Sequence, residues 1–409
     1  MPAFFLNSHF WGNAPNPFLV ADWYHGIKVG SMEAAIAICL AYGLILLGYF
    51  SFVPRKIEDR FHPIREGEGG VFIVVMMVCL AIACGVVYVY ANQYGGIFEA
   101  IALANYIRAG VVEPGIFSFV KHFLDIGALG LYLIVAYLLF QKNFSFKTLW
   151  LVGILLLFVA FVVLAALLKA SRASCITVGL IIFVIYSVHR RAKAVKFLFF
   201  LIPLGVAVLL FGDWVFGRLH DLTVSWNYFI AGLKQGYSFS ESPLLALLIN
   251  FQYAYVSLEV YLTEVASSLH EWRWMVDWVY GFLSLIPERI FPLNVPPTVV
   301  ALNTKNVASF FPAAIPPGIL ASSFYSMDWL GLILCSLFYG WLGGVLHRIF
   351  VPHVLYAYWT SVVYVLIGVI WAWFVNYGDP GYFFQFNFLK FIFLGFWLVY
   401  GFRFYLKRD

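Results

Sequence analysis

The residues in this chain that most clearly could take part in chemistry are cations that interrupt a long apolar stretch. Residues 148–188 form a stretch about twice the length of one membrane span, and it is broken once, at Lys169-Ala-Ser-Arg172. Side chains at such a break can extend toward lipid headgroups. Alternatively they lie at the mouth of a cavity that binds an anion, since the planar donor fork of arginine fits a phosphate group. Both interpretations fit the sequence.

Further arginines lie outside the apolar stretches. Arg218 stands in Gly-Arg-Leu-His-Asp, Arg289 in Ile-Pro-Glu-Arg-Ile-Phe-Pro, and Arg108 in a short earlier connection. Taken singly, Arg218 and Arg289 would form ordinary surface ion pairs with the acidic residues near them. Together with Arg172 they bracket one long segment, 217–327. That grouping favours a shared anion site.

Candidates for proton transfer lie in the same segment. A general base there would have to be a histidine or a carboxylate, and we take His220, His270 and Glu264 as the candidates. The sequence does not choose among them, because most such side chains on a helix are simply solvated. The predicted outer connections lack Asp-x-Asp or a comparable pair of carboxylates. We therefore expect neither a metal ion nor another cofactor.

The composition requires that membrane helices position these residues. Of 409 residues, 63% are apolar and 11% are charged, which excludes a soluble enzyme and a disordered chain. We predict an all-α polytopic membrane protein with about nine, and up to eleven, transmembrane helices, any additional one falling within 93–118. The nine apolar runs of membrane length are 31–52, 71–92, 119–140, 147–169, 173–188, 196–216, 328–347, 354–375 and 387–405.

Charge and periodicity organise the chain further. Lysine and arginine gather in 53–70 and near 189–196, so the positive-inside rule puts these loops in the cytoplasm, the N-terminus outside and the C-terminus inside. Three parts follow: helices one to six in 1–216, a large and mostly helical outer domain in 217–327, and helices seven to nine in 328–409. Within the outer domain, apolar residues spaced by three and four from Leu244 to Leu269 predict an amphipathic helix.

Three stretches resemble the Wzy-type polymerases of O-antigen and related polysaccharide repeat units. They are Ser171-Arg172-Ala173 at the start of a span, Leu285 to Pro292, which is similar to the family's Ile-Pro-Arg segment, and Ile315 to Gly331, which is similar to its proline-containing entry into a span. Arg218 followed by Trp226 also resembles the related O-antigen ligases. The His-Asn pair of the ligases is missing, and Tyr325 stands in that region.

The resemblance implies a glycosyltransferase of GT-C-like architecture in the bacterial inner membrane, with its active site facing the periplasm. Its substrates would be oligosaccharides linked through pyrophosphate to undecaprenol, within membrane lipid. A chain-length regulator protein is an expected partner, and nucleic acid is not. The implied catalytic residues are Arg172, Arg218, Arg289, His220, His270 and Glu264, and the implied substrate-binding residues are Lys169, Arg108, Tyr325 and Trp226.

Two other functions fit the same features. One is an O-antigen ligase or another transferase of lipid-linked glycans. The other is a flippase or transporter of lipid-linked oligosaccharides, which is expected to have cations within its spans and no large outer domain.

Overall fold

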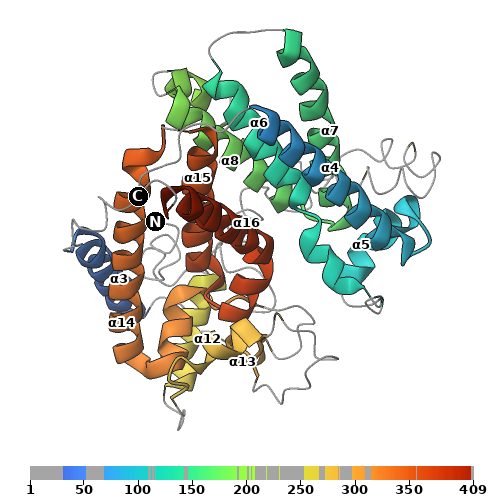
Figure 1. Ribbon diagram of the computed structural model, residues 1–409. Helices are drawn as coiled ribbons and strands as arrows, with labels where there is room; N and C mark the ends of the chain where they lie inside the picture. Colours follow the sequence, from blue (N-terminus) through green and yellow to red (C-terminus); the bar gives the residue numbers. More distant parts are fainter. Residues whose placement is uncertain are drawn as a thin grey trace. The chain divides into compact units, whose positions relative to one another are not determined.

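The helices that carry the candidate residues are seen in a computed structural model (Figure 1). It describes residues 31–51, 69–108, 112, 115, 117–141, 146–190, 193–199, 202–203, 205–207, 218, 230, 253–266, 272–283, 285, 297–308, 315–355 and 357–406. Within these ranges every regular element is a helix and none is a strand, which confirms the all-α class. Most of the predicted span 196–216, and of the segment that follows it up to residue 252, lies outside the described residues.

Eight of the nine predicted spans coincide with helices. A run of apolar residues that lies in lipid has no water to bind its backbone groups, and a helix satisfies those groups within the run. These helices are α3 (Met32–Phe50), α4 (Gly69–Asn92), α6 (Ile126–Phe140), α7 (Phe146–Leu168), α8 (Arg172–His189), α14 (Gly318–Phe350), α15 (Tyr358–Tyr377) and α16 (Pro380–Leu406). Among the described residues, six stretches are long and apolar enough to cross a membrane. They are Met32–Phe50, Phe72–Asn92, Phe119–Phe140, Trp150–Leu168, Gly318–His353 and Tyr358–Tyr377.

Shorter helices complete the described part of the chain. Within 93–118, where an additional span was allowed, α5 (Ile97–Arg108) has 12 residues, too few to cross a bilayer. A 3-10 helix (Ser118–Phe123) leads into α6. The segment 217–327, which the sequence predicts on the outer side and which we call the outer segment, contributes a helical stretch at 253–265, whose last turn is a π-helix (Tyr261–Val265), then α12 (Val276–Leu283) and α13 (Val299–Ala308). A 3-10 turn (Val351–His353) follows α14.

The chain folds into two compact units, each made of separate stretches. The first unit comprises Met1–Glu58, Glu241–Ile349 and Gly368–Phe388. The second comprises Asp59–Ser240, Phe350–Ile367 and Leu389–Asp409. The three parts predicted from the sequence, 1–216, 217–327 and 328–409, were defined by membrane topology, whereas these two units are defined by packing. The three-part division therefore stays a prediction.

In the first unit, α3 packs closely along the later part of α14 (Figure 1). A side chain at Gly48 would meet the backbone of Leu337, and side chains at Gly340 and Gly344 would meet the backbone of α3. Small residues four apart allow such close approach between membrane helices. Glycine is therefore required on both sides of this contact.

The amphipathic helix predicted in the outer segment buries its apolar side in the same unit. Tyr255, Leu258, Leu262 and Val265 are all buried, in one cluster with Ala34, Ala37 and Ala41 of α3 and with Phe324 and Tyr325 of α14. The predicted apolar positions are buried, but Ser257 and Glu259 and every other residue of 255–262 are buried too, so this stretch is enclosed on all sides and is not amphipathic. It fixes the outer segment against the beginning of α14.

In the second unit, α6 is the central helix. Ten of its 15 residues are buried, and α4, α7 and α8 pack around it. Gly127 and Gly130 of α6 lie against Phe161 and Phe158 of α7 so closely that a side chain would not fit at Gly130. Asp125, which immediately precedes α6, is thereby held at the end of a tightly packed bundle.

Candidate functional site

Ten catalytic or substrate-binding residues were predicted from the sequence, and the structure describes some of them more fully than others. Arg289, His220, His270 and Trp226 lie outside the described residues. The backbone alone is described for three others: Arg172 is the first residue of α8, Arg108 the last of α5, and Glu264 stands in the π-helical turn. Arg218 is described as a single, partly buried residue. The shared site of three arginines stays a prediction.

Lys169 lies in the turn between α7 and α8 and forms an ion pair. Its Nζ is 2.6 Å from Oδ1 of Asp125, and the Lys169 side chain is 14% exposed. The next residue, Ala170, has a φ of +47°. This left-handed backbone conformation is rare for alanine and makes the turn a tight one. One of the two interpretations of the sequence was a cation that meets an anion at this break. In the structure, the anion that Lys169 meets belongs to the protein.

A second polar region surrounds a break in α14, in the first unit. Met327 and Asp328 leave the helical conformation, and Asp328 has a φ of +51°. Because the helix is interrupted there, the carbonyl of Ser326 is available to other donors, and it accepts hydrogen bonds from the N–H groups of Arg273 at 2.9 Å and Trp274 at 3.2 Å. The break therefore ties the turn before α12 to the beginning of α14.

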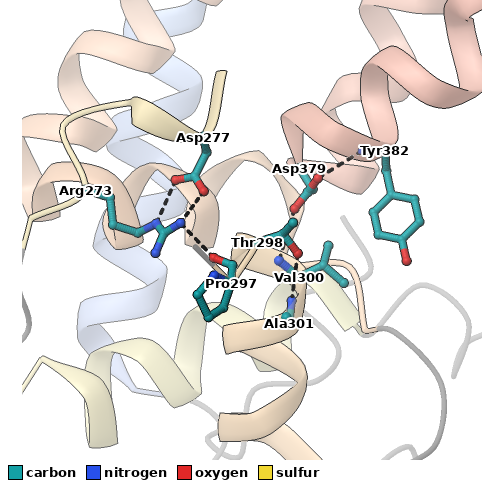
Figure 2. Close-up of polar contacts among 8 residues, drawn as sticks. All are labelled: Arg273, Asp277, Pro297, Thr298, Val300, Ala301, Asp379 and Tyr382. Atoms are coloured by element: carbon teal, nitrogen blue, oxygen red, sulfur yellow. Dashed lines mark hydrogen bonds and ion pairs between the residues drawn. The ribbon is translucent and has the colours of Figure 1, made fainter. Parts of the chain in front are cut away.

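Arg273 is held in this turn by three hydrogen bonds (Figure 2). Its Nε and Nη2 donate to the two carboxylate oxygens of Asp277, at 2.8 and 2.5 Å, and Nη2 also donates to the carbonyl of Pro297 at 2.8 Å. The hydrogen bonds to Asp277 raise the pKa of Arg273. A forked pair of this kind is strong and directional, so it fixes α12 against the residues that precede α13.

Asp379 connects the beginnings of two helices (Figure 2). It lies in the turn between α15 and α16 and is 1% exposed. Its Oδ1 accepts from the N–H of Tyr382 at 3.0 Å, in the first turn of α16, and its Oδ2 accepts from the N–H of Val300 at 3.1 Å, in the first turn of α13. Burial raises the pKa of this carboxyl group, against the effect of the backbone hydrogen bonds that it accepts. One side chain therefore caps two helices.

A cavity of about 20 Å³ lies beside these groups. Asp277, three serines (Ser322, Ser323 and Ser326) and the thiol of Cys335 line it, together with apolar side chains. Its volume and polar lining suit a single water molecule and exclude a sugar ring. The cavity itself therefore has room for water and none for a glycan.

Two further polar residues of the first unit are also enclosed. Glu259 is fully buried and accepts hydrogen bonds from the hydroxyl of Tyr255 at 2.7 Å and from the N–H of Ser31, just before α3, at 2.9 Å. Tyr325 is 1% exposed, and its hydroxyl accepts from Nδ2 of Asn306 at 2.9 Å. Its predicted contact with substrate would need this region to open.

Sequence reasoning missed Arg273 and Asp379 as partners in this arrangement. Two local signals were present. Arg273 and Asp277 are four residues apart, close enough in the sequence to pair across the turn that precedes α12. Asp379 directly precedes Pro380, the order expected for a helix cap and the first helical residue.

Comparison of the chain with protein-family models, curated proteins and solved structures found no match. The functional argument therefore rests on the residues and their geometry.

Proposed function

We propose that this chain is a membrane glycosyltransferase that polymerises oligosaccharide repeat units linked to undecaprenyl pyrophosphate. The growing glycan is transferred to a hydroxyl group of the next lipid-linked unit at the periplasmic face of the bacterial inner membrane. The general support is the set of helices that are long and apolar enough to cross a bilayer, since lipid-linked substrates are anchored in a bilayer. It is joined by the sequence resemblance in 171–173, 285–292 and 315–331.

The observation that carries the proposal concerns the stretch 315–331. Its Pro-Pro-Gly opens α14, where Gly318 has a φ of +70° and a side chain would collide with Ala254. Nine residues later the helix breaks, and the outer segment is tied to that break. The stretch that resembles a polymerase thus joins the outer segment to a long apolar helix. Such a junction suits an enzyme whose substrates have a sugar part in water and a lipid tail in the bilayer.

The exposed aromatic side chains at this junction support the same reading. Trp272 and Trp274 form an edge-to-face pair with ring centroids 5.2 Å apart, and they are 44% and 67% exposed. Tryptophan in this position anchors a protein at the membrane–water interface and also offers a flat surface to a sugar ring.

The proposed reaction needs charge stabilisation at one oxygen atom. The acceptor hydroxyl attacks the anomeric carbon of the donor, the bond from that carbon to the pyrophosphate oxygen breaks, and the electron pair leaves with the pyrophosphate. Arg172, Arg218 and Arg289 are proposed to stabilise that developing charge, which accelerates the step because the charge is largest in the transition state. His220, His270 or Glu264 takes the hydroxyl proton.

One observation favours a transporter as the second candidate. Lys390 of α16 falls within the predicted span 387–405, and a cation inside a span is expected for a flippase of lipid-linked sugars.

Lipopolysaccharide electrophoresis of a deletion strain separates these functions. Loss of a polymerase leaves the core with a single repeat unit, and a plasmid copy of the gene restores the ladder. Loss of a flippase or a ligase leaves the core without any repeat unit, and that pattern would overturn the proposal.

A further inference from the structure

The outward side of α12 and of the turn before it is apolar. Among the described residues of 272–285, every exposed side chain is apolar, and these side chains are Trp272, Trp274, Val279 and Phe282. Val279 and Phe282 are each 60% exposed. We name these four residues the α12 patch. A contiguous apolar patch of this kind marks a contact with a membrane or with another protein.

The other side of α12 faces the interior of the first unit. Trp278 packs against Phe374 and Phe383, with ring centroids 5.0 and 5.9 Å apart. Asp277 is 7% exposed, and a side chain at Gly281 would collide with the backbone at the beginning of α16. The helix is therefore amphipathic, and its packing on α15 and α16 fixes which side is exposed.

The turn before α12 is attached to α14 just before the apolar part of that helix begins. The N–H of Trp274 donates to the carbonyl of Ser326 at 3.2 Å, and the predicted span starts at residue 328. From there α14 exposes an apolar stripe spaced by four, four and three residues: Leu330, Leu334, Phe338 and Trp341. Such a stripe on a helix long enough to span a membrane faces lipid. The α12 patch thus follows one end of a lipid-facing surface.

The contacts of α12 with α15 and α16 indicate the same depth. Trp278 packs on Phe374, at the end of the predicted span 354–375. Gly281 lies against Pro380, which falls between that span and the following one. Three apolar runs therefore begin or end where α12 packs. The ends of spans lie at the membrane–water interface, where tryptophan is enriched.

The helix α13 in the same unit provides a contrast. Among its described residues, Ala301, Lys305 and Asn306 are exposed, and two of these three are polar. Arg273 connects the two helices, because it pairs with a residue of α12 and donates to the carbonyl of Pro297, just before α13. Two short helices joined in this way expose different surfaces. That of α13 suits water, and that of α12 suits lipid.

We propose that α12 lies in the headgroup layer of the bilayer, with Val279 and Phe282 directed toward the acyl chains and Trp272 and Trp274 among the headgroups. An amphipathic helix in this position inserts its apolar side by about 5–10 Å. Because Arg273 ties α12 to the residues before α13 and to the break in α14, the bilayer helps to hold the outer segment in place. The inference does not depend on the proposed transferase activity.

Spin labels on the full chain measure this depth. The five native cysteines are replaced by alanine, and one label is attached at Phe282→Cys or at Val279→Cys. The protein is reconstituted in vesicles of phosphatidylethanolamine and phosphatidylglycerol. Oxygen concentrates among acyl chains and a nickel chelate stays in water, so the ratio of collisions with the two reagents reports the depth. We expect both labels to collide mainly with oxygen, at a depth of about 5–10 Å.

Lys305→Cys is the matched control, at an exposed residue of α13. Its label should collide mainly with the nickel chelate, so that the ratio of oxygen to nickel collisions is several-fold lower than at Phe282. An equal ratio at the two positions would mean that the α12 patch faces water, which overturns the inference. Labels on α12 that neither reagent reaches would mean that protein covers the patch, for example a second copy of the chain, and this result overturns it too.

A second measurement keeps the native cysteines. Lipids brominated near the headgroup quench the fluorescence of tryptophans that lie in the interface. Replacing Trp272 and Trp274 together by phenylalanine should reduce the quenched part of the fluorescence. Trp278→Phe, at a ring packed inside the unit, should reduce it less. A quenched part that does not change in the double variant would overturn the inference.

Discussion

Replacing Asp379 by alanine should destabilise the protein more than the loss of an ordinary helix cap. The substitution removes the acceptors for Tyr382 in α16 and for Val300 in α13. Each lost cap costs about 0.5–2 kcal/mol. Val300 is 2% exposed, so water cannot replace its partner and the cost there is at the upper end of the range. We expect a total loss of about 2–4 kcal/mol.

Thr298→Ala provides the matched control. The hydroxyl of Thr298 caps the same helix, α13, through the N–H of Ala301 at 3.2 Å, but both residues are exposed. Water can replace that hydroxyl, so we expect a loss of about 0.5–1 kcal/mol. The fraction of purified protein that stays folded after heating, measured by fluorescence-detected gel filtration, ranks the variants. A loss in Asp379→Ala no larger than in Thr298→Ala would refute the double cap.

Three further predictions follow from the charged groups. Folding raises the pKa of Asp379 above 3.8, so the part of stability that depends on protonation of this group is complete below that pH and is lost as the pH rises through the raised value, whereas the hydrogen bonds to Tyr382 and Val300 remain. Thermal melting of wild type against Asp379→Asn, which does not titrate, should show this pH-dependent loss in wild type alone. Arg172→Ala should reduce polymer synthesis about 100–1,000-fold at unchanged protein level, with partial recovery in Arg172→Lys, and full-length polymer in the alanine variant would favour headgroup contact. Polymerisation should continue in excess chelator, and strict dependence on magnesium or manganese would contradict the proposed chemistry.

The apolar helices could be predicted from the sequence because burial in lipid requires long runs of apolar residues. The prediction was less accurate where a helix extends beyond its apolar run. The span predicted at 328–347 begins at the break in α14, but the helix itself starts at Gly318 and includes a buried turn rich in small and polar residues. Similarly, α16 begins at Pro380, seven residues before the predicted span at 387–405. Hydropathy marks the membrane portion and misses the helix beyond it.

The polar arrangements were predictable only where they are local. Arg273 and Asp277 are only four residues apart, although Arg273 lies in the turn before α12 and not on the helix itself. The contacts of Asp379 with α13 and of Lys169 with Asp125 join residues distant in the sequence, and they depend on how whole helices pack. No periodicity or motif in one sequence specifies that packing.

Polymerisation by the purified chain tests the central claim most directly. The protein would be reconstituted in liposomes and given lipid-linked repeat units alone, and the products would be separated by electrophoresis. We predict a ladder of glycans that increase by one repeat unit and remain linked to lipid, with release of undecaprenyl pyrophosphate in equal number to the bonds formed. Repeat units that stay single, or that only move across the bilayer without joining, would contradict the assignment.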